Sequence, residues 1–385
     1  MIRSYSRGNL FNNFRDWFFY KKTGHVPDYT FLLLLVVILI LGLVFLSSAS
    51  SVISYDEYKD AYFLFKQQLY KGIILGLFVF FVTSHIPFDF WRKNALLILI
   101  SGLVLVLLIF VPGIGIEYLG GRRWLNLPGF SFQPSEFLKL ALIIYLAAWF
   151  ETKQPEIKNL QATFLPFVGI LALVATLVLL QPDMGTTFLL VAICVSMYYL
   201  AGGSIFYISG LGIIGSIIFW FLVKQAPYRL DRLTIFLNPE IDPQGIGYHI
   251  NQAFLAIGSG GLLGRGLGHS RQKFNYLPEV ANDSIFAVIA EELGFILTFF
   301  FLSLYFYFFY RGMSIAKKAP DLFSKLLVSG IMVWIIWQVL VNIMAMVGLV
   351  PLTGTPLPFV SYGSSSLVVL LAGLGIIFNV SRFTK

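Results

Sequence analysis

The feature that most constrains this chain is a series of long apolar runs, of roughly 18 or more residues, within a sequence of 385 residues. A helix of roughly 20 apolar residues crosses the hydrocarbon core of a bilayer. We expect helices because lipid leaves the backbone to satisfy its own hydrogen bonds, and because the runs lack the alternation of barrel strands. The sequence therefore predicts an all-α polytopic membrane protein with ten transmembrane helices. The runs lie near residues 29–50, 69–86, 95–112, 134–150, 163–180, 185–201, 205–223, 285–310, 324–349 and 366–380.

The composition excludes an ordinary soluble domain. Hydrophobic residues make up 58% of the chain and charged residues only 12%, whereas soluble domains carry about a quarter charged residues. The single cysteine, Cys194, lies in an apolar run, so an intrachain disulfide is excluded and core packing is expected. The four histidines are scattered and indicate no metal site.

The distribution of basic residues predicts the orientation in the membrane. If both termini are cytoplasmic, the cytoplasmic segments hold more than half of the 27 Lys and Arg residues, as the positive-inside rule requires. We therefore expect a cytoplasmic N-terminal segment over 1–28, a transmembrane domain over 29–380 and a cytoplasmic C-terminus over 381–385. The first run is too long for a cleaved signal peptide. Anionic lipid accounts for the net charge of +8 without any nucleic acid partner.

One outer connection, about 224–284, is much longer than the others and is expected to carry function. Within it, Ile250, Phe254 and Ile257 recur at helical spacing, which predicts an amphipathic helix over 246–257 at the membrane surface. The glycine-rich stretch 258–268 follows. Its spacing matches neither a Walker loop nor a dinucleotide fingerprint, so a small-residue contact between helices is the ordinary interpretation.

Ionisable residues near membrane depth mark candidate sites, because each costs roughly 2.5–3.5 kcal/mol on insertion scales. In this chain they gather toward the predicted outer side, which favours an outward-facing polar cavity. The polar residues of this region lie before the predicted spans or within their outer halves. They are Arg122, Arg123, Gln133, Glu136, Lys139, Asp183, Asp283, Glu291 and Glu292.

Each of these residues also has a structural interpretation. Glu136 and Lys139 are three residues apart and can neutralise each other. Asp183 can cap the helix that follows it, and Asp283 or the adjacent serine can cap the eighth span. Glu291 and Glu292 lie deeper, where a carboxylate is either protonated or paired with Arg or Lys.

The combination of basic side chains and a loop aspartate indicates a class of chemistry. Cations hold a phosphate or diphosphate leaving group, and an aspartate accepts the proton of an attacking hydroxyl. A transporter for an anionic solute fits the same composition nearly as well.

Four segments resemble the SEDS family of shape, elongation, division and sporulation proteins. They are GRRWLNLPGFSFQPSEFLKL (121–140), QPDMGTT (181–187), GSGGLLGRGLGHSRQKFNYLPEVANDSIFAVIAEELGF (258–295) and PLTGTPLPFVSYGSSS (351–366). They follow one another in the family's order and, with the ten predicted spans, cover nearly the whole chain. The stretch GLGHSRQKFNYLPE is closer to the division branch, FtsW, than to the elongation branch, RodA.

The resemblance implies a peptidoglycan glycosyltransferase that polymerises lipid II on the outer face of the bacterial cytoplasmic membrane and releases undecaprenyl diphosphate. It also implies a class B penicillin-binding protein as partner, together with other divisome or elongasome membrane proteins at the septum. No cofactor is certain from the resemblance. A divalent cation, Mg²⁺ or Mn²⁺, bridging the diphosphate is compatible with the chemistry, although the sequence shows no dedicated ligands.

Residue roles carry over by position. Asp283 is similar to the family's catalytic aspartate, whose implied task is to activate the 4-hydroxyl of one sugar for an inverting attack on another. Glu136 and Lys139, in the motif that opens at Gln133, resemble the family's polar pair in the central cavity. The remaining implied substrate contacts are Arg122 and Arg123 of the basic outer loop, Lys66 and Gln67 at the mouth of the second span, and Asp183 and Ser361 at motif positions that helix-end packing also explains.

Two departures from the family pattern concern the neighbours of the aspartate. Ala281, Asn282, Asp283 and Ser284 stand where His-Thr-Asp-Phe is common, and residues 361–366 read SYGSSS where SYGGSS is usual. The aspartate itself is retained. Three other functions remain open at this point: a lipid II flippase, a non-catalytic scaffold that activates its penicillin-binding partner, and an elongation polymerase of the RodA type.

Overall fold

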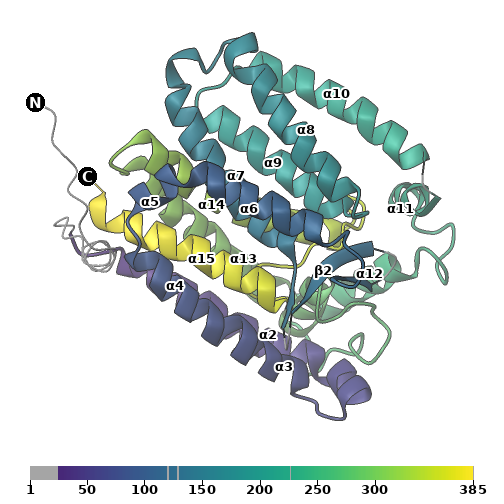
Figure 1. Ribbon diagram of the computed structural model, residues 1–385. Helices are drawn as coiled ribbons and strands as arrows, with labels where there is room; N and C mark the ends of the chain where they lie inside the picture. Colours follow the sequence, from purple (N-terminus) through teal and green to yellow (C-terminus); the bar gives the residue numbers. More distant parts are fainter. Residues whose placement is uncertain (1–24, 119–120, 128–129, 226, 385) are drawn as a thin grey trace, which may run out of the picture.

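The protein is a bundle of helices, seen here in a computed structural model that describes residues 25–118, 121–127, 130–225 and 227–384. The first and last described residues, His25 and Thr384, lie together at one end of the bundle, and a small sheet lies at the other end (Figure 1). Of the predicted N-terminal cytoplasmic segment, residues 1–24 lie outside the described residues, as does Lys385 of the predicted C-terminal segment.

Every one of the ten predicted runs is helical. Short helices α5 (Phe88–Lys93), η2 (Gln154–Glu156) and η4 (Ser381–Phe383) lie between or after them. The helices of the ten runs are α2 (Tyr29–Tyr58), α3 (Phe63–Gln67) continued by η1 (Gln68–Ile74) and α4 (Leu75–His85), α6 (Ala95–Leu108), α7 (Pro134–Thr152), η3 (Leu160–Phe164) continued by α8 (Leu165–Leu179), α9 (Met184–Leu200), α10 (Ile205–Lys224), α13 (Ile285–Lys317), α14 (Leu322–Met346) and α15 (Ser364–Val380).

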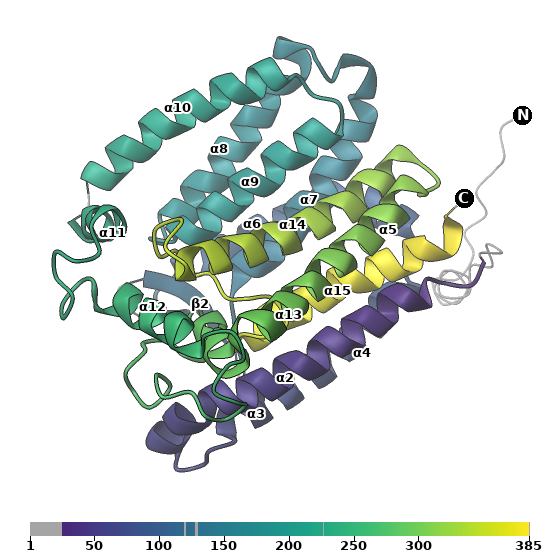
Figure 2. The ribbon, with the colours of Figure 1, turned by 180° about the vertical axis from the view of Figure 1, so that it is seen from behind.

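Seven of the described helical segments are long and apolar enough to cross a membrane, which makes this a multi-pass membrane protein. Helices α6 and α9 are apolar but shorter, and α7 carries Glu136 and Lys139. The core centres on α14 and α15, where most side chains are buried. By contrast, α10 lies at the outside of the bundle (Figure 2). Among its described residues, Val223 alone is buried.

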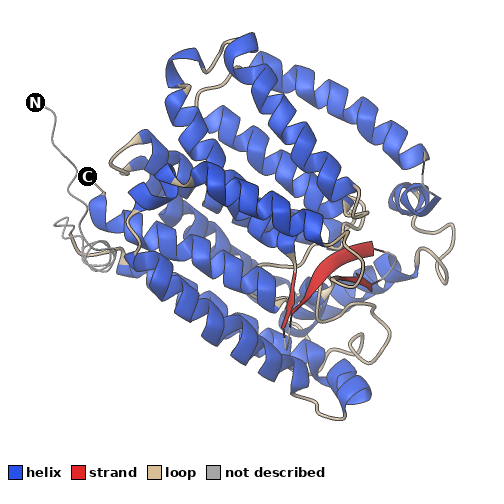
Figure 3. Ribbon diagram, viewed as in Figure 1, coloured by secondary structure: helices blue, strands red, loops and turns tan. Residues whose placement is uncertain are grey.

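The strictly all-α prediction missed one element, a three-stranded antiparallel sheet shown in red in Figure 3. Its strands are β1 (Gly115–Tyr118), β2 (Gly121–Leu127) and β3 (Phe130–Phe132). Leu125 of β2 pairs with Gly115 on one side and Phe132 on the other. Strands β1 and β3 are too short for a period-2 pattern to stand out, and in β2, which reads GRRWLNL, polar and apolar residues do not alternate strictly.

The long connection between α10 and α13 contains two helices, α11 (Pro227–Leu237) and α12 (Tyr248–Gly260). Helix α12 confirms the predicted helix over 246–257, because Ile250, Ala253 and Ala256 face the protein interior. The sequence did not predict α11. Both helices lie at the end of the bundle opposite the chain termini (Figure 1), and the location of α12 at a membrane surface stays a prediction.

Helix α13 is broken at Gly294, whose backbone angles are φ 69° and ψ −179°. The glycine-rich loop fills the break. The N–H groups of Arg265 and Gly266 donate to the carbonyls of Glu291 and Glu292 at 3.0 Å, and Phe295 N–H donates to Gly261 O at 2.8 Å. A Cβ atom on Gly294 would stand 2.1 Å from the Gly264 nitrogen. The glycines therefore allow the backbone of the loop to approach the backbone of α13 closely. This agrees with the interpretation of the glycine-rich stretch as a small-residue contact.

The two glutamates beside the break are buried and paired. Glu292 accepts from Ser48 Oγ at 2.6 Å and from Lys273 Nζ at 3.1 Å. Glu291 accepts from the N–H of Arg271 at 3.0 Å and lies 3.4 Å from the Arg265 Nε. The prediction that these carboxylates pair with Arg or Lys is confirmed, and the pairs fasten the loop to α2 and α13.

We predict that Gly294→Ala destabilises the whole protein. The new Cβ would meet backbone atoms, and a positive φ is strained for alanine, so we expect the free energy of unfolding to fall by about 2 kcal/mol or more. Thermal unfolding of the full chain in detergent measures this. The matched control is Gly215→Ala on α10, where a Cβ meets nothing within 4 Å; equal unfolding midpoints for the two variants would contradict the packing argument.

Candidate active site at Asp283

Asp283 lies at the junction of four segments, at the end of the bundle opposite the termini. It immediately precedes the N-cap of α13, and its side chain is buried. The other segments are α12, the last part of α14, and the non-helical segment 351–363 between α14 and α15, which we call the 351–363 segment. An acidic side chain buried at such a junction is a candidate functional group.

The 351–363 segment is non-helical yet enclosed, so its backbone carbonyls need donors from side chains. Asn342 Nδ2 donates to Thr355 O at 2.8 Å, and Gln338 Nε2 donates to Pro356 O at 3.0 Å. Tyr305 Oη donates to Pro358 O at 2.6 Å. These bonds hold the segment against α13 and α14.

The same contacts position the backbone of Asp283. Asn342 Nδ2 also donates to Asp283 O at 2.7 Å. Ser361 Oγ donates to Asn282 O, and the Tyr362 N–H donates to Ala281 O at 2.8 Å. The two residues that precede the aspartate are therefore bound to the 351–363 segment, and its own carbonyl is bound to α14.

The carboxylate of Asp283 is not used as a helix cap. The N-cap of α13 is Ser284, and no side chain caps that helix. Asp283 Oδ1 is buried and has no hydrogen-bond partner among the described residues. A buried carboxylate oxygen left unpaired is costly, so the capping interpretation does not account for this side chain.

The surroundings raise the pKa of Asp283 from 3.8 to about 7. Burial is the main cause, and the nearby negative charge of Glu279 adds to it. Hydrogen bonding from the backbone of Asp283 and Ser284, and the positive charge of Arg232, act in the opposite direction on this pKa. A carboxyl group with a pKa near neutrality can both accept and release a proton at physiological pH.

His249 of α12 lies beside this group and was not identified from the sequence as a site residue. Its Nε2 atom is 2.6 Å from Ser284 Oγ, next to Asp283 in the chain. Burial, together with the charge of Arg232, lowers the pKa of His249 from 6.5 to about 4. The imidazole is therefore neutral at pH 7 and acts as a hydrogen-bonding group.

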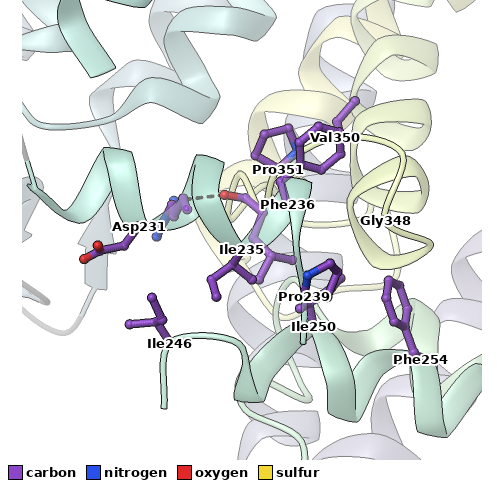
Figure 4. A pocket seen from close by; sticks show the side chains of 12 residues that line it. Asp231, Ile235, Phe236, Pro239, Ile246, Ile250, Phe254, Gly348, Val350 and Pro351 are labelled. Carbon is purple, nitrogen blue, oxygen red and sulfur yellow. Dashed lines mark hydrogen bonds between the residues drawn. The ribbon is translucent and has the colours of Figure 1, made fainter. Parts of the chain in front are cut away.

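A cavity of about 210 Å³ adjoins this region, between α11, α12 and residues 348–352. Ile250 and Phe254 of α12 and Ile235 of α11 give it an apolar lining (Figure 4). Arg232 also lines the cavity and donates to Leu352 O at 3.0 Å, the hydrogen bond drawn as a dashed line in Figure 4. Arg232 thus has an apolar cavity on one side and the Asp283 region within electrostatic range.

Glu136 and Lys139 form a second buried polar group, on α7. The Lys139 Nζ is 2.8 Å from Glu136 Oε1, and the side chains are 1% and 4% exposed. Glu136 also accepts from Ser366 Oγ at 2.9 Å, and Lys139 donates to Gln338 Oε1 at 3.4 Å. The mutual neutralisation that the spacing allowed is present in the structure.

One face of α14 connects the two polar groups. Gln338 contacts Lys139, and Asn342, four residues later, contacts Asp283. Four residues rise about 6 Å along a helix and return to the same face. The structure therefore brings Glu136, Lys139 and Asp283 to one polar face. Polar residues at positions i and i+4 within an apolar run are a signal that could have identified Gln338 and Asn342.

The remaining predicted residues lie at the same end of the bundle with differing contacts. Arg123 of β2 donates to the carbonyls of Gln181 and Pro182. Asp183 caps α9 by accepting from the N–H and the hydroxyl of Thr186 at 2.9 and 2.8 Å. Its structural interpretation is confirmed, and its contact with substrate stays a prediction. Arg122 is exposed on β2, and Gln133 is the N-cap residue of α7.

At the second span, the residue that contacts the 351–363 segment is Gln68, which follows the predicted pair Lys66 and Gln67. Lys66 is exposed and bound to Asp60 at 2.8 Å, and Gln67 is half-buried. Gln68 is buried, donates to Ser361 O at 3.4 Å and accepts from the Gly363 N–H at 3.1 Å. Gln68 begins the π-helical turn η1, and this turn rotates the following residues relative to an α-helix, which the sequence did not reveal.

The site offers chemistry based on one proton acceptor and nearby cations. Within the described residues, no group of three or more His, Cys, Asp and Glu could hold a metal ion. Asp283 supplies a base in a protected position, and Arg232 and Arg123 supply positive charge at the same end of the bundle. This arrangement suits activation of a hydroxyl near an anionic leaving group.

Comparison with known proteins gives matches over nearly the whole chain. The FTSW_RODA_SPOVE family model, described as cell cycle protein, matches residues 29–385. Stage V sporulation protein E of Bacillus subtilis is 41% identical over 95% of this chain and 99% of that protein. A probable peptidoglycan glycosyltransferase FtsW of Trichlorobacter lovleyi is 41% identical over 95% of this chain and 96% of that protein.

Two solved structures share the fold. The rod shape determining protein RodA of Thermus thermophilus has a TM-score of 0.67 and 27% sequence identity, covering 94% of this chain and 98% of that one. A chain from a peptidoglycan synthase complex, described as coordinating polymerization and crosslinking, has a TM-score of 0.75 and 27% identity, covering 93% and 98%.

A double-mutant cycle tests the buried pair on α7. Lys139→Met leaves Glu136 charged and unpaired, so we expect the free energy of unfolding to fall by about 3–5 kcal/mol. Adding Glu136→Gln to that variant removes the charge and is expected to recover most of the loss. Thermal unfolding of the full chain in detergent measures both steps. Lys66→Met, at an exposed pair, serves as the control, and no recovery in the double variant would argue against mutual neutralisation.

Proposed function

This chain belongs to the FtsW, RodA and SpoVE family of cell cycle proteins, and we propose that it acts as a peptidoglycan glycosyltransferase. The observation that carries the proposal is the buried carboxylate of Asp283, which has an unpartnered oxygen and a pKa of about 7. It lies in the segment that matches the family's catalytic aspartate. The comparisons with probable peptidoglycan glycosyltransferases supply the substrate class.

The proposed reaction is polymerisation of lipid II on the outer face of the cytoplasmic membrane. Asp283 takes the proton from the 4-hydroxyl of one sugar as its oxygen attacks the anomeric carbon of a second lipid-linked sugar. The bond from that carbon to the diphosphate breaks, and undecaprenyl diphosphate leaves. An α-linked donor becomes a β-1,4 linkage, so one displacement with one base suffices.

The other polar residues bind and orient in this proposal. Arg232 and Arg123 place positive charge where the diphosphate would develop negative charge on leaving. Glu136, Lys139 and Gln338 form a neutral, buried polar wall along α7 and α14. A divalent cation would be held chiefly by the oxygens of the diphosphate itself, because the described residues offer no group of three or more His, Cys, Asp and Glu as ligands, and it would neutralise the charge of the leaving group.

The biological setting is proposed from the same comparisons. A division role is favoured over elongation because the probable FtsW enzymes reach 41% identity, whereas the solved RodA reaches 27%. A class B penicillin-binding protein is the proposed partner, since one structural neighbour comes from a complex that couples polymerization and crosslinking. We place ten helices across the membrane, both termini in the cytoplasm, residues 224–284 outside, and the protein at the division septum among other divisome proteins.

The first test is glycan synthesis from purified lipid II by the protein co-purified with its penicillin-binding partner. Asp283→Asn keeps the shape but removes the base, so we expect polymer formation to fall by about 10²–10⁴-fold. Glu240→Gln, at an exposed acid of the long connection, is the matched control and should retain wild-type activity. Equal polymer from the wild type and Asp283→Asn would refute the assigned base. Movement of lipid II across vesicles without polymer from either protein would instead indicate a transporter.

The pH dependence of polymer formation gives a second test. The base acts only when deprotonated, so the rate should rise about tenfold per pH unit below the pKa of Asp283 and level off above pH about 7. Glu279→Gln removes a neighbouring negative charge and should lower that pKa, moving the rising limb to lower pH. For Glu240→Gln, the rising part of the pH–rate profile should lie at the same pH as in the wild type. An unmoved limb in Glu279→Gln would mean that another group controls the rate.

A further inference from the structure

A second cavity, of about 400 Å³, lies at the end of the bundle where the chain begins and ends, and we call it the terminal cavity. It is formed by the start of α2, the last turns of α13 and the residues after α15. Its lining is largely polar, unlike that of the cavity beside Asp283. The lining residues that carry charge or lie at the helix ends are Asp28, Tyr29, Arg311, Ser314, Lys318 and Ser381.

Hydrogen bonds between distant parts of the chain fix the walls of the terminal cavity. The His25 N–H donates to Arg382 O at 2.8 Å, and His25 Nε2 lies 2.8 Å from Thr384 O. The Asp28 N–H donates to Ser381 Oγ at 3.1 Å. Asp28 also caps α2 by accepting from the Phe31 N–H at 3.0 Å. The cavity is therefore a built feature of the folded chain.

The charges around the terminal cavity favour an anion. Arg311 uses its Nε to pair with Asp28 at 2.8 Å, which leaves the two amino groups of the guanidinium to bind other acceptors. Lys318, two turns further along α13, is exposed and forms no ion pair with any described residue. The first turn of α2 adds the N–H groups of Tyr29 and Thr30, because that of Phe31 is already bound by Asp28. Among the described lining residues, the cations Arg311 and Lys318 thus outnumber the one acid, Asp28.

Apolar surface begins directly beside this charge. Tyr29 lines the cavity and is 60% exposed, and Leu33, one turn along α2, is 62% exposed. On α13, Tyr310 is one turn from Ser314 of the lining and is 65% exposed. In a membrane protein, these exposed faces lie against lipid chains, and tyrosines mark the level of the headgroups. A ligand for this place needs an anionic head and apolar chains.

We propose that the terminal cavity binds the phosphate group of an anionic phospholipid, held by Arg311 and Lys318, with the lipid chains along the exposed faces of α2 and α13. Arginine and lysine are the usual phosphate-binding side chains. Basic pockets between transmembrane helices on the cytoplasmic side are known to bind lipid headgroups. This site is separate from Asp283 and does not depend on the proposed glycosyl transfer.

The test is a binding titration of the full-length protein in a neutral detergent. Dihexanoyl phosphatidylglycerol is added below its micelle concentration, and the unfolding midpoint and the number of retained lipids in native mass spectra are followed. We expect a saturable rise of the midpoint. Dihexanoyl phosphatidylcholine, which has no net charge, and glycerol 3-phosphate, which has no chains, should leave the midpoint unchanged.

Two variants locate the binding. Lys318→Gln should weaken the apparent affinity for dihexanoyl phosphatidylglycerol about fivefold, and it removes no ion pair on which folding depends. Lys317→Gln removes the same charge from the neighbouring residue, which does not line the cavity, and should bind like the wild type.

Four outcomes would overturn the proposal. Equal weakening in both variants would mean diffuse attraction to the basic end of the bundle. An equal response to glycerol 3-phosphate would mean a site for a free phosphate ester, and an equal response to the phosphatidylcholine would remove any role for the anion. Absence of any saturable effect would mean that the cavity binds no phospholipid.

Discussion

The need to satisfy backbone groups in the 351–363 segment governs the rest of this structure. That segment crosses the end of a helix bundle without a helix of its own, so its carbonyls depend on side chains from neighbouring helices. Asn342 donates to Thr355 O and also to Asp283 O. One amide group thereby fixes both the segment and the proposed base. The position of Asp283 is a consequence of how the non-helical backbone is held.

Charge pairing distinguishes structural from functional ionisable residues in this chain. Glu136 is paired with Lys139, and Glu292 is paired with Lys273, in both cases with nearly complete burial. Asp283 is also buried but has one oxygen without a partner. Asp183 is buried without a cation, but both of its oxygens accept hydrogen bonds from Thr186. Since a protein interior strongly favours neutral pairs, Asp283 is the carboxylate left available for the proposed chemistry. Burial alone would not have separated these carboxylates.

The apolar runs predicted the helices well, because twenty apolar residues in succession leave a membrane protein few alternatives. The predicted pairing of Glu291 and Glu292, the cap at Asp183 and the helix α12 are likewise confirmed. The sheet was missed because polar and apolar residues do not alternate strictly in its strands. Helix α11 was missed although Leu230, Leu233 and Leu237 recur at helical spacing. The contact of Gln68 with the 351–363 segment was missed because Lys66, Gln67 and Gln68 are consecutive polar residues, and the sequence does not show which of them faces the protein interior. Asn342 was missed because its role depends on a segment that follows it in the chain.

The break in α13 also determines how deep the charged residues lie. From Phe295 to Lys317 the helix is about 34 Å long, which by itself spans the hydrocarbon core of about 30 Å. Large exposed apolar side chains begin at Phe295, whereas residues 285–292 are all buried in protein. The part of α13 that carries Glu291 and Glu292 can therefore stand above the hydrocarbon. Asp283, eleven residues before the break, then lies at the level of the lipid headgroups, where the lipid-linked diphosphate of the proposed reaction would be presented.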